Sequence, residues 1–337
     1  MQKYLLGATI VLMASMIWQT QAATAYERPV RRPAIVLAAF GTTDVDAVRS
    51  ILNIRDRVRA AFPDYDVHLA FTSNIIRSIW HKRANDAAFR NANPNVPAEV
   101  YCITNALSTL AAVQENGARP VLVQSLHVTD GEEYADLANL VEALSAYKTV
   151  KPVLHPFPWI AVGQPALGVG DGAAPALERA AEAIRPLADQ AKASGSALVL
   201  MGHGNEHLNQ TVFAKFEQIL RGKFGPHVYV GTVEAEPLAE DIAKAMRADN
   251  APAKVLLAPL MVVAGDHAKN DMAGEEEDSW ASIFSAEGFG VTCHLQGLGS
   301  NDSWADIYVE HLRAIESAVV AAKQAQEAEE NAKAAAE

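Results

Sequence analysis

Three polar residues in the second half of this 337-residue chain follow apolar runs that are typical of buried strands. His203 follows "ALVLMG", Glu234 closes "HVYVGTV", and His267 follows "APLMVVAGD". Because the carboxyl ends of parallel strands meet at one edge of a sheet, these side chains can converge although they are far apart in sequence. Two imidazoles and a carboxylate suit a first-row divalent metal with open coordination positions. The pattern therefore predicts a metal site.

Glu133 is a fourth candidate, and an internal repeat selects it. The segments "VLVQSLHVTDGEEY" (121–134) and "VLLAPLMVVAGDHA" (255–268) align at a constant offset, which places Glu133 opposite His267. A carboxylate that reaches the same site from another domain can accept protons or steer a cation. Glu133 also fits an ordinary acidic helix start, which the helix dipole favours. Both interpretations stay open.

The elements that would position these residues form a regular alternation of short apolar runs and helical patterns. Strands are expected at 34–41, 66–72, 119–128, 150–156, 197–204, 227–234, 253–263 and 290–297. Continuous apolar strands joined by helices indicate parallel sheets covered on both faces. We predict an α/β fold of two doubly wound, Rossmann-like domains, related by internal duplication and facing a common cleft.

The domain boundaries follow from composition. Residues 156–175 are rich in Pro and Gly and form a natural connection between the halves. We predict a signal peptide at 1–25, an N-terminal α/β domain at 30–160 and a C-terminal α/β domain with the metal site at 161–300. Residues 301–337 are predicted to be a C-terminal helix with a solvated tail.

The amino terminus has the pattern of an export signal. Lys3 precedes a mostly apolar run at 4–18 and then "TQAATA", which predicts cleavage after Ala22 or Ala25. An uncleaved anchor is the alternative. No later segment has about 18 uninterrupted apolar residues, so no membrane span is expected in the mature chain. The expected location is outside the cytoplasm, in the periplasm if the source is Gram-negative.

Charge and cysteine content exclude some functions. The net charge of −12 argues against nucleic acid as a partner, because phosphates require a basic face. Cys102 and Cys293 are too few for a thiolate zinc site, and they are either bridged or two free buried thiols. The acidic run at 275–278 is either a negative approach for cations or a solvated helix start.

Several motifs together resemble one enzyme family. "QSLHVTDGEEY", "MGHG", "GTVEAEP" and "PLMVVAGDHAKNDMAG" are similar to segments of the sirohydrochlorin cobaltochelatases of the anaerobic cobalamin pathway, which are of the same class as protoporphyrin ferrochelatase. The similarity runs from "VLAAFGTT" to "GLGSN". It implies two α/β domains around a tetrapyrrole cleft and metal insertion without ATP. It also matches His203 and His267 to metal-binding histidines, Glu234 to their associated carboxylate, and Glu133 to an acidic residue at the cleft.

The expected reaction is insertion of cobalt(II), or of iron(II), into sirohydrochlorin or a related tetrapyrrole. Two pyrrole N–H protons must leave, and His203, His267 or Glu133 would accept them. Export is at odds with cytoplasmic cobalamin and sirohaem synthesis, so an exported carrier of haem or metal is the alternative, with His127 or His81 as an axial ligand to haem. A homo-oligomer is compatible with either function.

Overall fold

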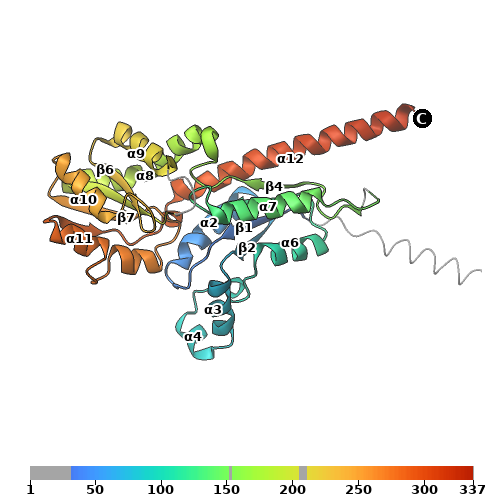
Figure 1. Ribbon diagram of the computed structural model, residues 1–337. Helices are drawn as coiled ribbons and strands as arrows, with labels where there is room; N and C mark the ends of the chain where they lie inside the picture. The colour runs from blue at the N-terminus through green and yellow to red at the C-terminus, as the bar shows by residue number, and fades with distance from the viewer. Residues whose placement is uncertain (1–31, 152–153, 205–210, 337) are drawn as a thin grey trace, which may run out of the picture.

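The computed structural model describes residues 32–151, 154–204 and 211–336, and it confirms the predicted α/β class. Two four-stranded sheets form two units that lie side by side, with helices on their faces (Figure 1). The first sheet has the order β2-β1-β3-β4 and the second has the order β6-β5-β7-β8. All strand pairs are parallel. The strands are β1 (Ala34–Ala39), β2 (Asp66–Phe71), β3 (Val121–Ser125), β4 (Ile160–Gly163), β5 (Ala197–Gly202), β6 (Val228–Thr232), β7 (Lys254–Pro259) and β8 (Gly290–Cys293).

The central strands are apolar throughout because both of their faces are covered. In β1, Ile35 and Leu37 belong to one core, and Ala34 and Val36 belong to another on the opposite face. Successive side chains of a strand point to opposite faces, so burial on both sides requires an unbroken apolar run rather than alternation.

The register of the two sheets confirms the predicted duplication. Ala34 pairs with Val121 in the first sheet, and Ala197 pairs with Val255 in the second. The sequence repeat sets Val121 opposite Val255, and their strand partners Ala34 and Ala197 are therefore equivalent as well. The two sheets therefore have the same strand order and the same register. The end of each strand in the first sheet corresponds in position to the end of its counterpart in the second sheet.

Helices connect the strands and cover the sheets. They are α2 (Val48–Ala61), α3 (Asn74–Ala84), α4 (Ala87–Ala92), α5 (Ala98–Tyr101), α6 (Ala106–Glu115), α7 (Glu132–Ala146), α8 (Ala174–Ser194), α9 (Thr211–Phe224), α10 (Ala239–Ala248), α11 (Trp280–Ala286) and α12 (Asp302–Ala336), with short turns η2 (Gly170–Ala173), η3 (Ala268–Met272) and η4 (Leu298–Ser300). Over the described ranges, no helix combines the length and the apolar character that crossing a membrane requires.

The C-terminal helix α12 returns from the second unit to the first, where it packs against β3 and β4 as well as α2 (Figure 1). Trp304, Tyr308 and Leu312 of this helix are fully buried. Arg57 of α2 donates two hydrogen bonds of 2.7 Å to Asp306 of α12. One continuous core joins α2, α8 and α12 with the inner faces of both sheets. Residues 320–326, farther along α12, are all exposed.

The strand predicted at 150–156 is not the fourth strand of the first sheet: its described residues, 150–151 and 154–156, are not in a strand, and residues 152–153 lie outside the described residues. The fourth strand of the first sheet is β4, which pairs Ile160 with Val121 and lies within the segment interpreted as the connection between the halves. This edge strand is short and three of its four residues are only half-buried, so it lacks the apolar run that identifies the central strands. The connection to the second unit follows β4. The domain boundaries themselves stay predictions.

The two cysteines are free thiols, which excludes a disulfide between them in this structure. Cys102 is exposed and Cys293 is half-buried, so the expectation of two buried thiols is also wrong. Burial raises the pKa of the Cys293 thiol. The predicted signal peptide, residues 1–25, lies outside the described residues.

Candidate metal site

The three predicted ligands lie on neighbouring loops at the carboxyl edge of the second sheet. His203 directly follows β5, Glu234 follows β6, and His267 lies in the loop beyond β7. The Glu234 N–H donates to the carbonyl oxygen of His203 at 2.9 Å, and the Val233 N–H donates to that of Gly202 at 3.0 Å. These backbone hydrogen bonds hold the first two loops together beyond the ends of their strands.

Gly204 makes this close approach of the loops feasible. Its φ is +85°, a conformation that residues with a side chain rarely adopt, and a Cβ there would lie 2.6 Å from the Thr232 hydroxyl oxygen. The Thr232 hydroxyl also accepts a hydrogen bond of 3.2 Å from the Ala235 N–H. A glycine after His203 is therefore a structural requirement of the site.

The side chains of the three residues are brought together. The rings of His203 and His267 are 4.7 Å apart between centroids and nearly perpendicular, at 88°. The Glu234 carboxylate lies 3.4 Å from Nδ1 of His203. The side chains of His203, Glu234 and His267 are 47%, 47% and 38% exposed, so all three are open to solvent. The three residues predicted from the sequence therefore lie close together in the structure.

Hydrogen bonds fix which nitrogen of each ring is available. Nδ1 of His203 lies 3.1 Å from the carbonyl oxygen of Gly204, and Nδ1 of His267 lies 2.5 Å from a carboxylate oxygen of Asp271. A carbonyl oxygen and an ionised carboxylate only accept hydrogen bonds, so each Nδ1 is the donor. In a neutral imidazole the other nitrogen then carries the lone pair. Both Nε2 atoms can therefore bind a metal.

Asp271 is a site residue that the sequence analysis missed. It lies four residues after His267 on the π-helical turn η3, so its carboxylate reaches back to the ring of His267. Metal-binding histidines commonly donate their second N–H to a carboxylate in this way, and π-helical turns often occur at functional sites. The spacing of four residues is the signal that could have identified Asp271.

Coordination of one ion by all three predicted ligands requires a change of rotamer. Over the described ranges, no three His, Cys, Asp or Glu side chains are already arranged to hold one metal ion. Glu234 lies on the Nδ1 side of His203, which is the donor side of that ring. Because the side chains are exposed, rotation about their χ angles is not blocked by packing. The three-residue ligand set stays a prediction.

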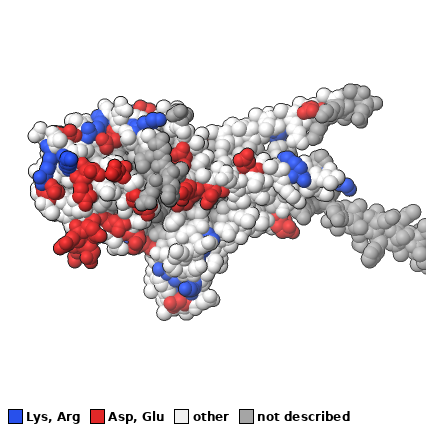
Figure 2. Space-filling view, in the orientation of Figure 1, with Lys and Arg blue, Asp and Glu red and all other residues white. Residues whose placement is uncertain are grey.

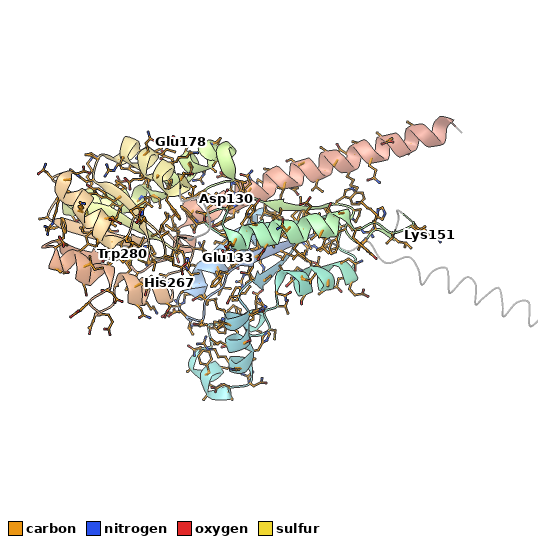
Figure 3. All side chains as sticks on the ribbon, viewed as in Figure 1. Asp130, Glu133, Lys151, Glu178, His267 and Trp280 are labelled. Atoms are coloured by element: carbon orange, nitrogen blue, oxygen red, sulfur yellow. The ribbon has the colours of Figure 1, made fainter. Side chains whose placement is uncertain are left out.

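The carboxyl edges of the two sheets meet beside His267. A Cβ on Gly265 would lie 3.0 Å from the Thr42 hydroxyl oxygen in the loop after β1, and Lys269 forms an ion pair with Asp44 of the same loop. Glu133 is an exposed residue in the first turn of α7, which follows β3. In Figure 3, Glu133 lies at the end of α7 nearer the second unit, and His267 lies on the side of its unit nearer the first.

In both proposed haem ligands one ring nitrogen contacts another protein group. Nδ1 of His127 lies 2.8 Å from the Ser125 hydroxyl oxygen, and its Nε2 is buried with no hydrogen-bond partner among the described residues. Burial lowers the pKa of His127 to about 4, although the charge of Glu133 acts in the opposite direction. Nε2 of His81 lies 2.7 Å from the carbonyl oxygen of Ile103. These contacts give a role as haem ligand no support.

The acidic run after the site is an exposed loop. Glu275, Glu276, Glu277 and Asp278 are all exposed, and α11 begins only at Trp280. Figure 2 shows acidic side chains gathered over the second unit. The attraction of cations by this run stays a prediction.

Known proteins are similar to this chain over most of its length. The family model described as "Cobalt chelatase (CbiK)" matches residues 33–317. The chain is 32% identical over 292 residues to the sirohydrochlorin cobaltochelatase CbiKC of Nitratidesulfovibrio vulgaris, covering 86% of this chain and 93% of that protein. It is 30% identical over 283 residues to a sirohydrochlorin cobaltochelatase of Salmonella typhimurium, covering 83% and 95% respectively.

A solved structure shares the fold at low sequence identity. SirB from Bacillus subtilis with Fe3+ is similar with a TM-score of 0.56 and 11% identity, over 84% of this chain and 95% of that one. The family match extends over both sheets and over every residue of the His203, Glu234 and His267 cluster. This chain therefore belongs to the cobalt chelatase family.

Proposed function

We propose that this protein is an ATP-independent chelatase that inserts cobalt(II) into sirohydrochlorin. The single observation that carries the proposal is the pair of imidazoles at the joint edge of the two sheets. His203 and His267 meet at 4.7 Å with both Nδ1 atoms engaged as donors, so two Nε2 lone pairs are available to one ion. The names of the two relatives support both the metal and the tetrapyrrole.

The metal is a substrate in this reaction, so the site must bind it and also release it. Two neutral imidazoles hold a divalent ion without fully neutralising its charge, and Glu234 can join them by rotating its side chain. Open coordination positions then remain for the pyrrole nitrogens. Imidazole and carboxylate accept cobalt(II) and iron(II) alike, so the preference for cobalt rests on the relatives.

Insertion replaces two pyrrole N–H protons by one divalent ion, and both protons need an acceptor. Glu133 is exposed in the first turn of α7 and belongs to the unit opposite the metal cluster. A carboxylate in that place can take a proton from the face of the macrocycle that does not meet the metal. We assign metal delivery to His203 and His267 and the acceptance of one proton to Glu133. The second proton passes to Nε2 of His203 or His267, whose lone pair is free again once the metal has been transferred.

The double variant His203→Ala/His267→Ala tests the proposed function. Anaerobic insertion of cobalt(II) into sirohydrochlorin, followed by absorbance, should be abolished, because no imidazole is left to hold the ion. The matched control is His155→Ala/His227→Ala. These histidines lie at the opposite end of the strands, before β4 and before β6. Circular dichroism should show the native fold in both variants.

Two outcomes would contradict the proposal. Substantial turnover in the double variant would remove His203 and His267 from the reaction. A wild-type protein that carries bound tetrapyrrole but shows no insertion with either cobalt(II) or iron(II) would favour the carrier function instead.

We also propose that the protein is exported by its amino-terminal segment.

A further inference from the structure

Phe40 is a large apolar residue that is exposed directly after a fully buried strand. It directly follows β1, in which all six residues are buried, yet 48% of Phe40 is exposed. Ile75, in the first turn of α3 just beyond β2, is 74% exposed. Two large apolar side chains therefore lie at the carboxyl edge of the first sheet.

Phe40 has the same place in the first unit that His203 has in the second. The Ser73 N–H donates to the carbonyl oxygen of Phe40 at 3.3 Å, and the Glu234 N–H donates to that of His203 at 2.9 Å. The strand register of the two sheets is also equivalent. The duplicated fold thus presents a metal-binding residue from one unit and an aromatic ring from the other.

The turn directly after Phe40 requires a glycine. Gly41 has a φ of +100°, and a Cβ there would lie 2.7 Å from the ring of Phe71. Phe71 is fully buried and fills the core at the end of β2. A side chain at position 41 would clash with the ring of Phe71, so the chain can turn here only with a glycine.

Phe40 lies close to the junction of the two sheets. Thr42, two residues later, is the residue that a Cβ on Gly265 would approach to 3.0 Å, and His267 is two residues beyond Gly265. The loop that carries Phe40 therefore packs against the loop that carries His267.

We propose that Phe40, together with Ile75, holds one face of the tetrapyrrole macrocycle and sets its nitrogens opposite His203 and His267. This inference rests on the proposed function and deepens it. A macrocycle is flat and conjugated with large apolar faces, so an exposed aromatic ring packs against it favourably. Neither Phe40 nor Ile75 has an atom that binds cobalt(II). The first unit would thus bind the ring, and the second unit the metal.

A titration of metal-free sirohydrochlorin under anaerobic conditions tests this assignment. Phe40→Ala should raise the Kd about tenfold, while Phe40→Trp should keep it near the wild-type value. The affinity for cobalt(II) alone should not change in either variant. Tyr147→Ala is the matched control, because Tyr147 is 61% exposed and follows the far end of α7. Its Kd for sirohydrochlorin should equal that of the wild type.

Each contrary result has a separate meaning. An unchanged Kd in Phe40→Ala would overturn the assignment. An unchanged Kd with a new oligomeric state, measured by light scattering, would assign Phe40 to a contact between copies and would also overturn it. If His203→Ala/His267→Ala retained turnover, the proposed metal site would be wrong. A raised Kd for sirohydrochlorin in Phe40→Ala would still support the contact between Phe40 and the macrocycle.

Discussion

At the scale of single residues, the site depends on the orientation of two imidazoles. Nδ1 of His267 donates to Asp271, and Nδ1 of His203 donates to the Gly204 carbonyl. The first acceptor is a charged side chain and the second is backbone. A carboxylate partner increases the basicity of the ring and fixes its tautomer. Only the partner of His267 can be removed by substitution.

Replacing Asp271 by Ala should weaken cobalt(II) binding by about 10- to 100-fold, because the ring of His267 loses its orientation and part of its basicity. Asp271→Asn should restore part of the affinity, since the amide oxygen still accepts from Nδ1. A competition titration against a chelator of known affinity measures the change. The control is Asp266→Ala. The Asp266 carboxylate accepts a hydrogen bond from the Asn270 side chain on the same turn, not from His267. Equal losses in both alanine variants would attribute the effect to the turn and not to His267.

The sequence predicted His203, Glu234 and His267 as a cluster because each follows a recognisable apolar run. Asp271 could not be found in the same way. It lies in "AKNDMAGEEED", where five acidic residues follow His267 within a short stretch. Only the phase of the helical turn brings Asp271, and not its neighbours, back to the ring of His267.

At the scale of elements, the four central strands and three of the four edge strands were predictable, and the edge strand β4 was not. Seven of the expected strands overlap β1, β2, β3, β5, β6, β7 and β8, although the expected ranges extend past the observed carboxyl ends. β4 was missed because Ile160, Ala161 and Val162 are only half-buried, and a short run with one covered side carries little apolar signal. The segment 150–156 has β-branched residues, but two prolines interrupt it.

The loop after β5 should tolerate no side chain at Gly204. Gly204→Ala forces a Cβ into a positive φ and against the Thr232 hydroxyl, a strain of about 1–2 kcal/mol before any clash. We expect a lower melting temperature and a loss of cobalt insertion, because the His203 and Glu234 loops must separate. Calorimetry and the insertion assay measure the two effects.

Gly222→Ala is the control for this variant. Gly222 lies in α9 with no atom near its would-be Cβ, so alanine there should stabilise the protein by about 0.5–1 kcal/mol. If Gly204→Ala inserted cobalt(II) at the wild-type rate, the close approach of the His203 and Glu234 loops would not be needed for the reaction.

At the scale of the whole molecule, the two units form one body. The core that spans α2, α8 and α12 reaches both sheets, and the Arg57–Asp306 ion pair ties α2 to α12. A ring that binds at the junction therefore meets two edges that are already held in place. Preorganisation of this kind reduces the entropy lost on binding.

The amino-terminal signal segment should be cleaved from the chain when the protein is exported. Expressed with its native amino terminus in a Gram-negative host, the protein should be recovered from the periplasm and begin at Ala23 or Tyr26, because the apolar run at 4–18 and the small residues after it form a cleavable signal. Amino-terminal sequencing and cell fractionation check this. A variant without residues 1–25 should stay in the cytoplasm. A product in the membrane fraction that still begins at Met1 would show an anchor instead.

The return of α12 to the first unit sets an order of events during biosynthesis. Helix α12, in which Trp304, Tyr308 and Leu312 are fully buried, packs against β3 and β4, and the ribosome adds it long after those strands. The apolar surface of β3 and β4 in the first half of the nascent chain thus stays exposed until α12 has been synthesised. During that interval it is the part of the polypeptide most in need of a chaperone.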